Sequence, residues 1–174
     1  MILDDERNEL PPGATGVIYV RLPMFGDFSY TNEDGGKGAK TDDGFATVDD
    51  VGYVDEDGYI FICDRAKDMI ISGGANIFPV EIEAALIEMP DIADCAVFGA
   101  PDPEFGESIV AAVQLQPDAT PDVDAIKAFL APRLAAMKIP RQVDFHNALP
   151  REDSGKIFKQ KLRAPYWEKA GRRI

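Results

Sequence analysis

The first part of the chain carries short apolar runs separated by turn-forming residues, a pattern typical of β-strands. Residues 16–22 are apolar and partly β-branched, and they predict one strand. Residues 50–54 and 59–63 predict two more. The Asp57-Gly58 pair between them predicts a hairpin, because glycine supplies the positive φ that such turns need. Two polar stretches predict irregular chain: residues 1–15 as a mobile lead-in and residues 30–44 as a loop.

From residue 69 onward, apolar runs of strand length alternate with runs of helical period. Strands are predicted over residues 69–71, 92–100, 108–116 and 142–145. Helices are predicted over residues 79–89, 121–137 and 157–163. Pro132 should kink or interrupt the second helix, and Pro165 should end the third. This alternation indicates a small α/β or α+β domain after a β-rich segment, with the charged run 64–68 as the boundary.

Composition narrows the class of protein. The 174 residues are 45% hydrophobic, which is enough for a packed core. No stretch approaches the roughly 20 apolar residues that cross a bilayer, and the first residues lack the pattern of a secretory signal. Cys63 and Cys95 lie in apolar runs, without metal-ligand spacing to each other or to His146. We therefore expect reduced thiols in a cytoplasmic protein, and no protein metal site.

The charge is unevenly distributed. The net charge of -13 argues against a nucleic-acid partner, because phosphate binding needs clustered Lys and Arg. Residues 1–150 hold 10 basic and 28 acidic side chains, whereas residues 151–174 hold 8 basic and 3 acidic ones. A basic end on an acidic body predicts either contact with an anionic ligand or a solvated terminal helix.

Three short segments could carry chemistry. Ser72-Gly73-Gly74, expected between a strand and a helix start, could bring backbone N–H groups close to an anion or an extended ligand, or could be a plain turn. Lys156, after Ser154-Gly155, could place a point charge on phosphate, or could be an ordinary surface lysine. Asp50 could bind the vicinal hydroxyls of a ribose, or could form a turn.

These segments occur together in an order that resembles one family. The runs that carry the resemblance are residues 50–59, residues 64–83 and residues 149–157. Together they are similar to the C-terminal motifs of the adenylate-forming acyl-CoA synthetases, of the fatty-acid or aryl-acid ligase type. The resemblance covers about residues 45–163. Two motifs of that family's large domain are absent: its Ser/Thr/Gly-rich phosphate loop and its aromatic-Gly-x-Thr-Glu segment.

The resemblance implies a function. Such enzymes activate a carboxylic acid with ATP, form an acyl-adenylate and pyrophosphate, and then exchange AMP for the thiol of coenzyme A. It implies one role for each segment: Lys156 as the catalytic lysine of adenylation, Asp50 and Arg65 as nucleotide-binding residues, Lys67 as the hinge residue, and Ser72, Gly73 and Gly74 as the coenzyme A loop. Mg²⁺ is expected only with ATP.

The resemblance also implies an α+β fold class, with a small central sheet and flanking helices, and a division of the chain into parts. Residues 1–63 correspond to the β-rich end of a large AMP-binding domain, residues 64–68 to a hinge, and residues 69–174 to a mobile C-terminal domain. We expect the isolated chain to be inactive without the N-terminal large domain, and its exposed strands to favour self-association. Two alternatives stay open: a stand-alone module that binds nucleotide or coenzyme A, and a partner domain for a separately encoded large domain. Asp49 stands where the family usually has glycine, and Asp64 replaces another common glycine.

Overall fold

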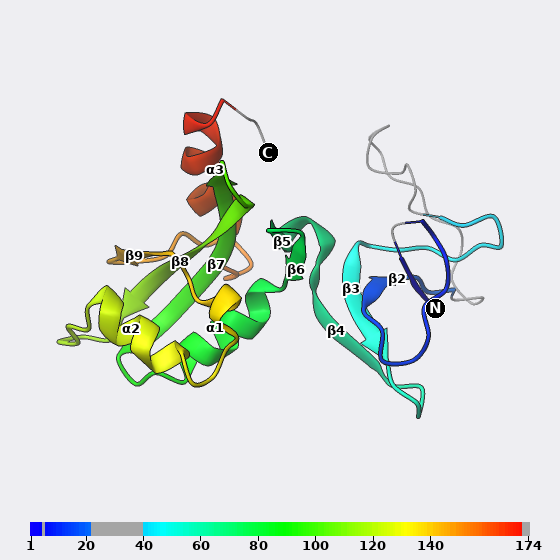
Figure 1. The fold of residues 1–174 in the computed structure, drawn as a ribbon, viewed down its shortest axis with the longest axis horizontal. Helices are drawn as coiled ribbons and strands as arrows, with labels where there is room; N and C mark the ends of the chain where they lie inside the picture. The colour runs from blue at the N-terminus through cyan, green and yellow to red at the C-terminus, as the bar shows by residue number, and fades with distance from the viewer. Residues whose placement is uncertain (5, 22–39, 172–174) are drawn as a thin grey trace. The chain divides into compact units, whose positions relative to one another are not determined.

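The computed structural model describes residues 1–4, 6–21 and 40–171. The chain divides into two compact units, Met1–Lys67 and Asp68–Ile174, which are drawn in Figure 1 and described separately below. Leu22 of the first predicted strand and residues 30–39 of the predicted loop lie outside the described residues.

The N-terminal unit is built on a four-stranded antiparallel sheet. The order of its strands in the sheet is their order in the sequence: β1 (Ile2–Leu3), β2 (Gly16–Ile18), β3 (Asp50–Val54) and β4 (Ile60–Arg65). The predicted strand 16–22 is therefore shorter than expected, and Val20 makes only an isolated bridge to Ala46.

The prediction of a mobile lead-in over residues 1–15 is wrong. Ile2 and Leu3 are each only 4% exposed and pair with β2, so this segment contributes to the core of the unit. The chain then turns back at Asp4, whose Oδ1 accepts hydrogen bonds from the N–H groups of Glu6 and Asn8. Most polar residues of the segment belong to this turn and the chain after it. The prediction therefore overlooked the two buried apolar residues that precede the turn.

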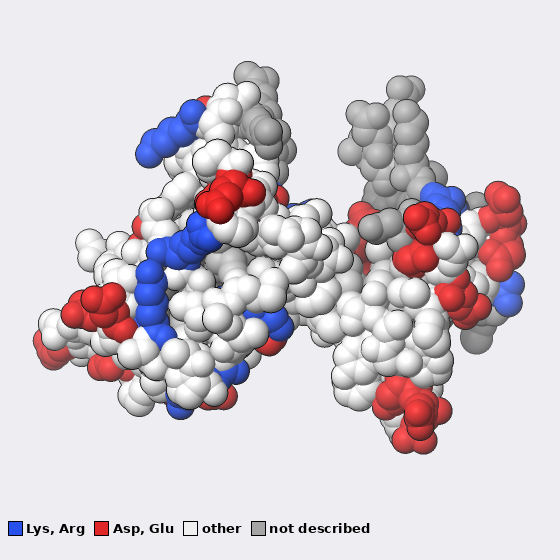
Figure 2. Space-filling view, in the orientation of Figure 1, with Lys and Arg blue, Asp and Glu red and all other residues white. Residues whose placement is uncertain are grey.

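The predicted hairpin over residues 50–63 is confirmed as β3 and β4. Asp55 shapes its turn, because its Oδ1 accepts from the N–H groups of Asp57 and Tyr59. Figure 2 shows acidic side chains at the tip of this hairpin and a mostly uncharged surface over the two strands. β4 is the last strand of its sheet, and its first three side chains, Ile60, Phe61 and Ile62, are exposed, as is Tyr59 just before it.

The C-terminal unit contains a five-stranded sheet. Its centre is the long antiparallel pair β7 (Ile92–Asp102) and β8 (Gly106–Leu115). The other edge of β8 carries β5 (Ile70–Ser72), which joins it at Ser72 and Gly106, and β9 (Gln142–His146), which runs parallel to it. β6 (Ala75–Ile77) pairs with β5 and completes the sheet.

Helices cover both faces of this sheet (Figure 1). On one face, α1 (Pro79–Ile87) and α2 (Val123–Leu130) contribute Ile82, Leu86, Ile126 and Leu130 to the larger core. On the other face, Leu162 of α3 (Lys159–Lys169) packs with Phe98 and Val110. Successive residues of β7 and β8 alternate between the two cores, as the two-residue period of a strand requires. The predicted α+β class, with a central sheet and flanking helices, is confirmed.

Proline had different effects in the two later helices. α2 ends at Leu130, two residues before Pro132, so the predicted interruption is confirmed, and only a short 3₁₀ turn, Ala136–Lys138, follows. The prediction that Pro165 ends the last helix is wrong, because α3 begins at Lys159 and continues through Pro165 to Lys169. Contacts beyond the proline hold the helix on the sheet: the Tyr166 hydroxyl donates to Asp144, and the Trp167 Nε1–H donates to the Gly99 carbonyl at 3.0 Å.

Candidate functional site

The structure brings Asp50 and Arg65 into contact. They lie opposite each other on β3 and β4, and Arg65 Nε is 3.3 Å from Asp50 Oδ1. Arg65 also donates from Nη2 to the Val48 carbonyl at 3.0 Å. The Asp50 side chain keeps 29% of its surface exposed, so its second oxygen can still accept hydrogen bonds from a ligand.

The residue before Asp50 has an unusual backbone. Asp49 lies in the left-handed region, with a φ of 64°. Only glycine adopts this region without a steric penalty, which is consistent with the glycine that the related motif usually has here. Ala66 follows Arg65 and begins a 3₁₀ turn, Ala66–Asp68, that contains Lys67.

Ser72-Gly73-Gly74 is a hairpin turn, and the expectation that it leads directly into a helix is wrong. Ser72 ends β5, and Ala75 begins β6, a strand that the sequence did not predict. The φ values of 58° at Gly73 and 80° at Gly74 are those of the tight two-residue turns that join antiparallel strands. The Gly73 N–H donates to the Phe105 carbonyl at 2.9 Å, while a Cβ added at Gly74 would meet no atom within 4 Å. A ligand could therefore approach the backbone closely at Gly74.

Lys156 follows Gly155 in a turn between β9 and α3. The turn is closed by backbone hydrogen bonds from the N–H of Glu152 to the Lys156 carbonyl at 2.9 Å and from the N–H of Phe158 to the Pro150 carbonyl at 2.8 Å. Gly155 has a φ of 85°, so the turn needs glycine there. Within the described residues, the Lys156 ammonium has no hydrogen-bond or ion-pair partner, and the residue is exposed.

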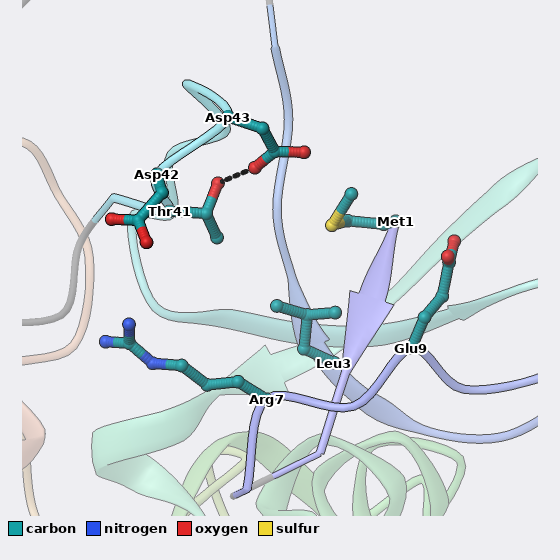
Figure 3. A pocket seen from close by; sticks show the side chains of 7 residues that line it. All are labelled: Met1, Leu3, Arg7, Glu9, Thr41, Asp42 and Asp43. Carbon is teal, nitrogen blue, oxygen red and sulfur yellow. Dashed lines mark hydrogen bonds between the residues drawn. The ribbon is translucent and has the colours of Figure 1, made fainter.

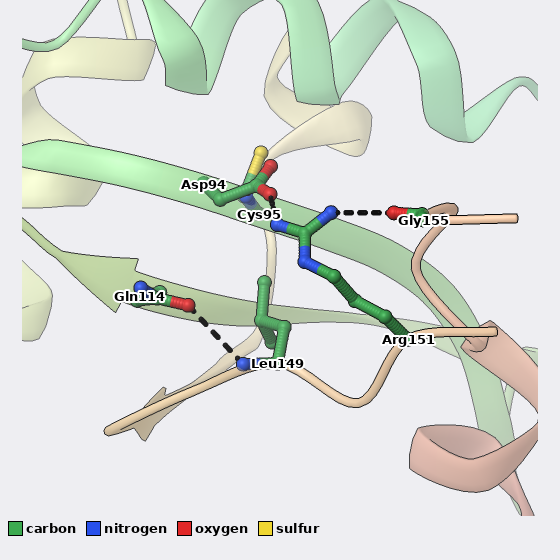
Figure 4. Close-up of polar contacts among 6 residues, drawn as sticks. All are labelled: Asp94, Cys95, Gln114, Leu149, Arg151 and Gly155. Atoms are coloured by element: carbon green, nitrogen blue, oxygen red, sulfur yellow. Dashed lines mark hydrogen bonds and ion pairs between the residues drawn. The ribbon is translucent and has the colours of Figure 1, made fainter. Parts of the chain in front are cut away.

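Side chains tie this turn to the sheet, as Figure 4 shows. The Leu149 N–H donates to Oε1 of Gln114 on β8 at 3.2 Å. Arg151 lies between two acceptors: its Nη1 donates to the Gly155 carbonyl at 2.8 Å, and its Nη2 pairs with Oδ2 of Asp94 on β7. Sequence reasoning missed both Arg151 and Asp94, because nothing in the sequence indicates that these two residues meet.

The neighbourhood of Asp94 is fixed by further contacts. Its Oδ1 accepts from the N–H of Cys95 at 2.9 Å. Burial, together with the negative charge of Glu83, raises the pKa of the Cys95 thiol to about 12, so this cysteine stays protonated. After the turn, Lys159 Nζ pairs with Oε1 of Glu83 on α1 at 2.8 Å.

Other features of the described residues add no further site of this kind. An open pocket of about 350 Å³ in the N-terminal unit is lined by residues of both charges, among them Arg7, Glu9, Asp42 and Asp43 (Figure 3). It contains none of the predicted site residues. The described residues hold no cluster of three or more His, Cys, Asp or Glu side chains that could bind a metal ion. In the same residues, every helix is too short or too polar to cross a membrane.

Comparisons with a family model and with known protein sequences point to the same class of enzyme. Residues 81–156 match the family model of the AMP-binding enzyme C-terminal domain. A fatty acid–[acyl-carrier-protein] ligase of Streptomyces coeruleorubidus is 40% identical over 174 residues, which are 99% of this chain and 33% of that protein. A feruloyl-CoA synthase of an Amycolatopsis species is 42% identical over 156 residues, which are 88% of this chain and 31% of that protein.

A solved structure agrees in fold. ATP-bound MatB from Rhodopseudomonas palustris superposes with a TM-score of 0.86 at 37% identity, over 95% of this chain and 33% of MatB. The chain thus spans about a third of the length of the proteins that it matches.

Proposed function

Residues 81–156 belong to the family of AMP-binding enzyme C-terminal domains, and from this premise we propose that the chain is the C-terminal part of an acyl-CoA synthetase. In the proposed reaction, an oxygen of a carboxylate substrate attacks the α-phosphorus of ATP, and pyrophosphate leaves. The thiol of coenzyme A then attacks the acyl carbon of the resulting adenylate, and AMP leaves.

Lys156 carries the first step in this proposal. Attack on the α-phosphorus gathers negative charge there, and an ammonium group aimed at that charge stabilises the transition state more than the ground state. The observation that carries the proposal is the exposed Lys156 ammonium at the end of a turn that is tied to the sheet, without a hydrogen-bond or ion-pair partner among the described residues.

Asp50 and Arg65 act on the nucleotide. We assign the ribose hydroxyls to the Asp50 carboxylate, which the Arg65 guanidinium holds in place. Arg65 is about half exposed, and its positive charge also favours the phosphates of ATP. ATP would bring Mg²⁺ with it, in keeping with the expectation that the protein has no metal site of its own.

The remaining assignments concern the second step. We assign the pantetheine arm of coenzyme A to the hairpin turn at Ser72, Gly73 and Gly74, where the open side of Gly74 allows a close approach. Residues 64–68, with Lys67, would form the hinge about which the domain over residues 69–174 turns between the two steps. Residues 1–63 would complete a large domain that the related ligases have and that supplies the rest of the site.

A hybrid enzyme tests the proposal. In the feruloyl-CoA synthase of Amycolatopsis, this chain would replace the matching segment, which is 42% identical to it. We expect the hybrid to form feruloyl-adenylate and feruloyl-CoA, and Lys156→Ala to slow adenylation by about a hundredfold or more. A folded hybrid without adenylation, or a Lys156→Ala hybrid as fast as its parent, would contradict the proposal.

The isolated chain provides the second arm of the test. We expect no acyl-CoA from ATP, coenzyme A and a panel of carboxylic acids, because the large domain is missing. Calorimetry with ATP and with coenzyme A then distinguishes the alternative of a stand-alone binding module. Tight binding of either ligand by the isolated chain, weakened by Lys156→Ala, would favour that module.

A further inference from the structure

We propose that Arg151, held by Asp94, is the positioning residue for Lys156. This inference rests on the proposed function, in which the Lys156 ammonium must reach one phosphorus atom. Arg151 does not itself touch substrate in this proposal. It acts through the turn that presents the lysine.

The contacts of Arg151 fix the residue just before Lys156. One end of its guanidinium holds the Gly155 carbonyl at 2.8 Å, and the other end is bound to Asp94 on the central strand β7. Gly155 is also the most adaptable point of the turn, because glycine has few steric limits. Arg151 therefore restrains the backbone at the place where small rotations would move Lys156 most.

Asp94 is itself well held, so it can serve as the fixed point. Its Oδ1 accepts from the Cys95 N–H at 2.9 Å while Oδ2 binds Arg151, and the Cys95 side chain lies in the larger core. Both Asp94 oxygens are thus engaged. The planar guanidinium connects this anchor to Gly155 with two hydrogen bonds at once, which a lysine at position 151 could not do with the same geometry.

A mainly stabilising role does not explain the arrangement. The Arg151 side chain is 46% exposed and that of Asp94 is 28% exposed. Ion pairs with this much contact with water contribute little to stability. Their removal should therefore leave the melting temperature nearly unchanged while it loosens the turn.

The chain offers a matched control. Arg133 makes the same two kinds of contact: its Nε is 3.3 Å from Glu88 Oε2, and its Nη1 donates to the Phe129 carbonyl at 2.8 Å. Its side chain is 38% exposed. It follows α2 and belongs to a different turn from Lys156. Arg133→Met thus removes an equivalent arginine without touching the turn of Lys156.

The first test uses the chain alone. Amide order parameters and hydrogen exchange at Gly155 and Lys156 would be measured by NMR for the parent, Arg151→Met, Asp94→Asn and Arg133→Met. We expect both Arg151→Met and Asp94→Asn to lower the order parameters and speed exchange at these two amides by about tenfold, with Arg133→Met like the parent. Unchanged Gly155 and Lys156 amides in Arg151→Met would overturn the inference.

The second test measures adenylation in the hybrid enzyme, as ferulate-dependent exchange of pyrophosphate into ATP. We expect Arg151→Met to lower kcat by about tenfold or more with less than a twofold change in KM for ATP, and Arg133→Met to change neither. If Lys156→Ala abolishes exchange but Arg151→Met does not slow it, the positioning role is wrong and the proposed function stands. If Lys156→Ala has no effect, the proposed function fails, whatever the NMR measurements give.

Discussion

The Asp49 carbonyl accepts a hydrogen bond from the Ala66 N–H at 2.7 Å, while Asp49 itself holds a left-handed backbone. This bond joins the start of β3 to the end of β4, next to Asp50 and Arg65. Because the Asp49 backbone is left-handed, the aspartate side chain causes steric strain that a glycine at this position would not have.

Substitution at Asp49 should reveal that penalty. We expect Asp49→Gly to keep the free energy of unfolding or raise it by up to about 1 kcal/mol, since relief of steric strain offsets the extra freedom of the unfolded chain. Asp49→Val should lower it by about 1–2 kcal/mol, because a β-branched residue is poorly suited to positive φ. Urea unfolding measures both variants, and an Asp49→Gly protein less stable than Asp49→Val would contradict this account.

Pro165 gives a second prediction. Inside α3 it cannot donate the helical hydrogen bond to the carbonyl of residue 161, and its ring crowds that turn. We expect Pro165→Ala to raise the free energy of unfolding by about 1–3 kcal/mol, as measured by thermal or urea unfolding. Pro132→Ala, just beyond the end of α2, is the control and should change stability less. A Pro165→Ala protein that is less stable than the parent would contradict this prediction.

The lowered pKa of Asp102 predicts that the stability of the protein depends on pH. The N–H groups of Phe105 and Glu104 donate to its carboxylate and, with the charge of Arg141, hold its pKa below the usual value. A lowered pKa in the folded state contributes stability above the unfolded pKa, and this is lost as the pH falls through the folded pKa. Asp102→Asn should thus be less stable than the parent at neutral pH, and the two should converge in acid. Calorimetric melting at several pH values measures this, and a gap that widens in acid would refute it.

The exposed strand β4 predicts self-association. Its sheet edge is unpaired within the described residues, and Ile62 is 67% exposed. We expect the chain to self-associate at high concentration in sedimentation experiments, and Ile62→Lys to shift it toward monomer. Ile71→Lys is the control, because Ile71 is 51% exposed but lies on β5, which has strands on both sides. A strictly monomeric parent would argue against this prediction.

Local signals explain what could be predicted from the sequence. The Asp57-Gly58 turn set the β3–β4 hairpin, and Pro79 marked the start of α1 where the structure has it. β6 was missed because three residues, Ala75–Ile77, are too few to show a period. The predicted end of α3 was wrong because Tyr166 and Trp167 contact residues far away in the sequence, and these contacts outweigh the local effect of Pro165.

In the candidate site, too, residues of local motifs could be predicted, whereas contacts between residues far apart in the sequence could not. Lys156, Asp50 and the glycine pair could be proposed from the sequence, because their motifs are contiguous in it. The pair Arg151 and Asp94 could not, because 57 positions separate the two residues and only the fold joins them.

The anchoring of α3 has a practical consequence. Trp167 is the only tryptophan of the chain, and its indole is bonded to the Gly99 carbonyl of β7. Its emission therefore reports the detachment of the last helix from the C-terminal sheet. Circular dichroism follows both units. A difference between the two transition midpoints would show that the halves of this chain unfold independently.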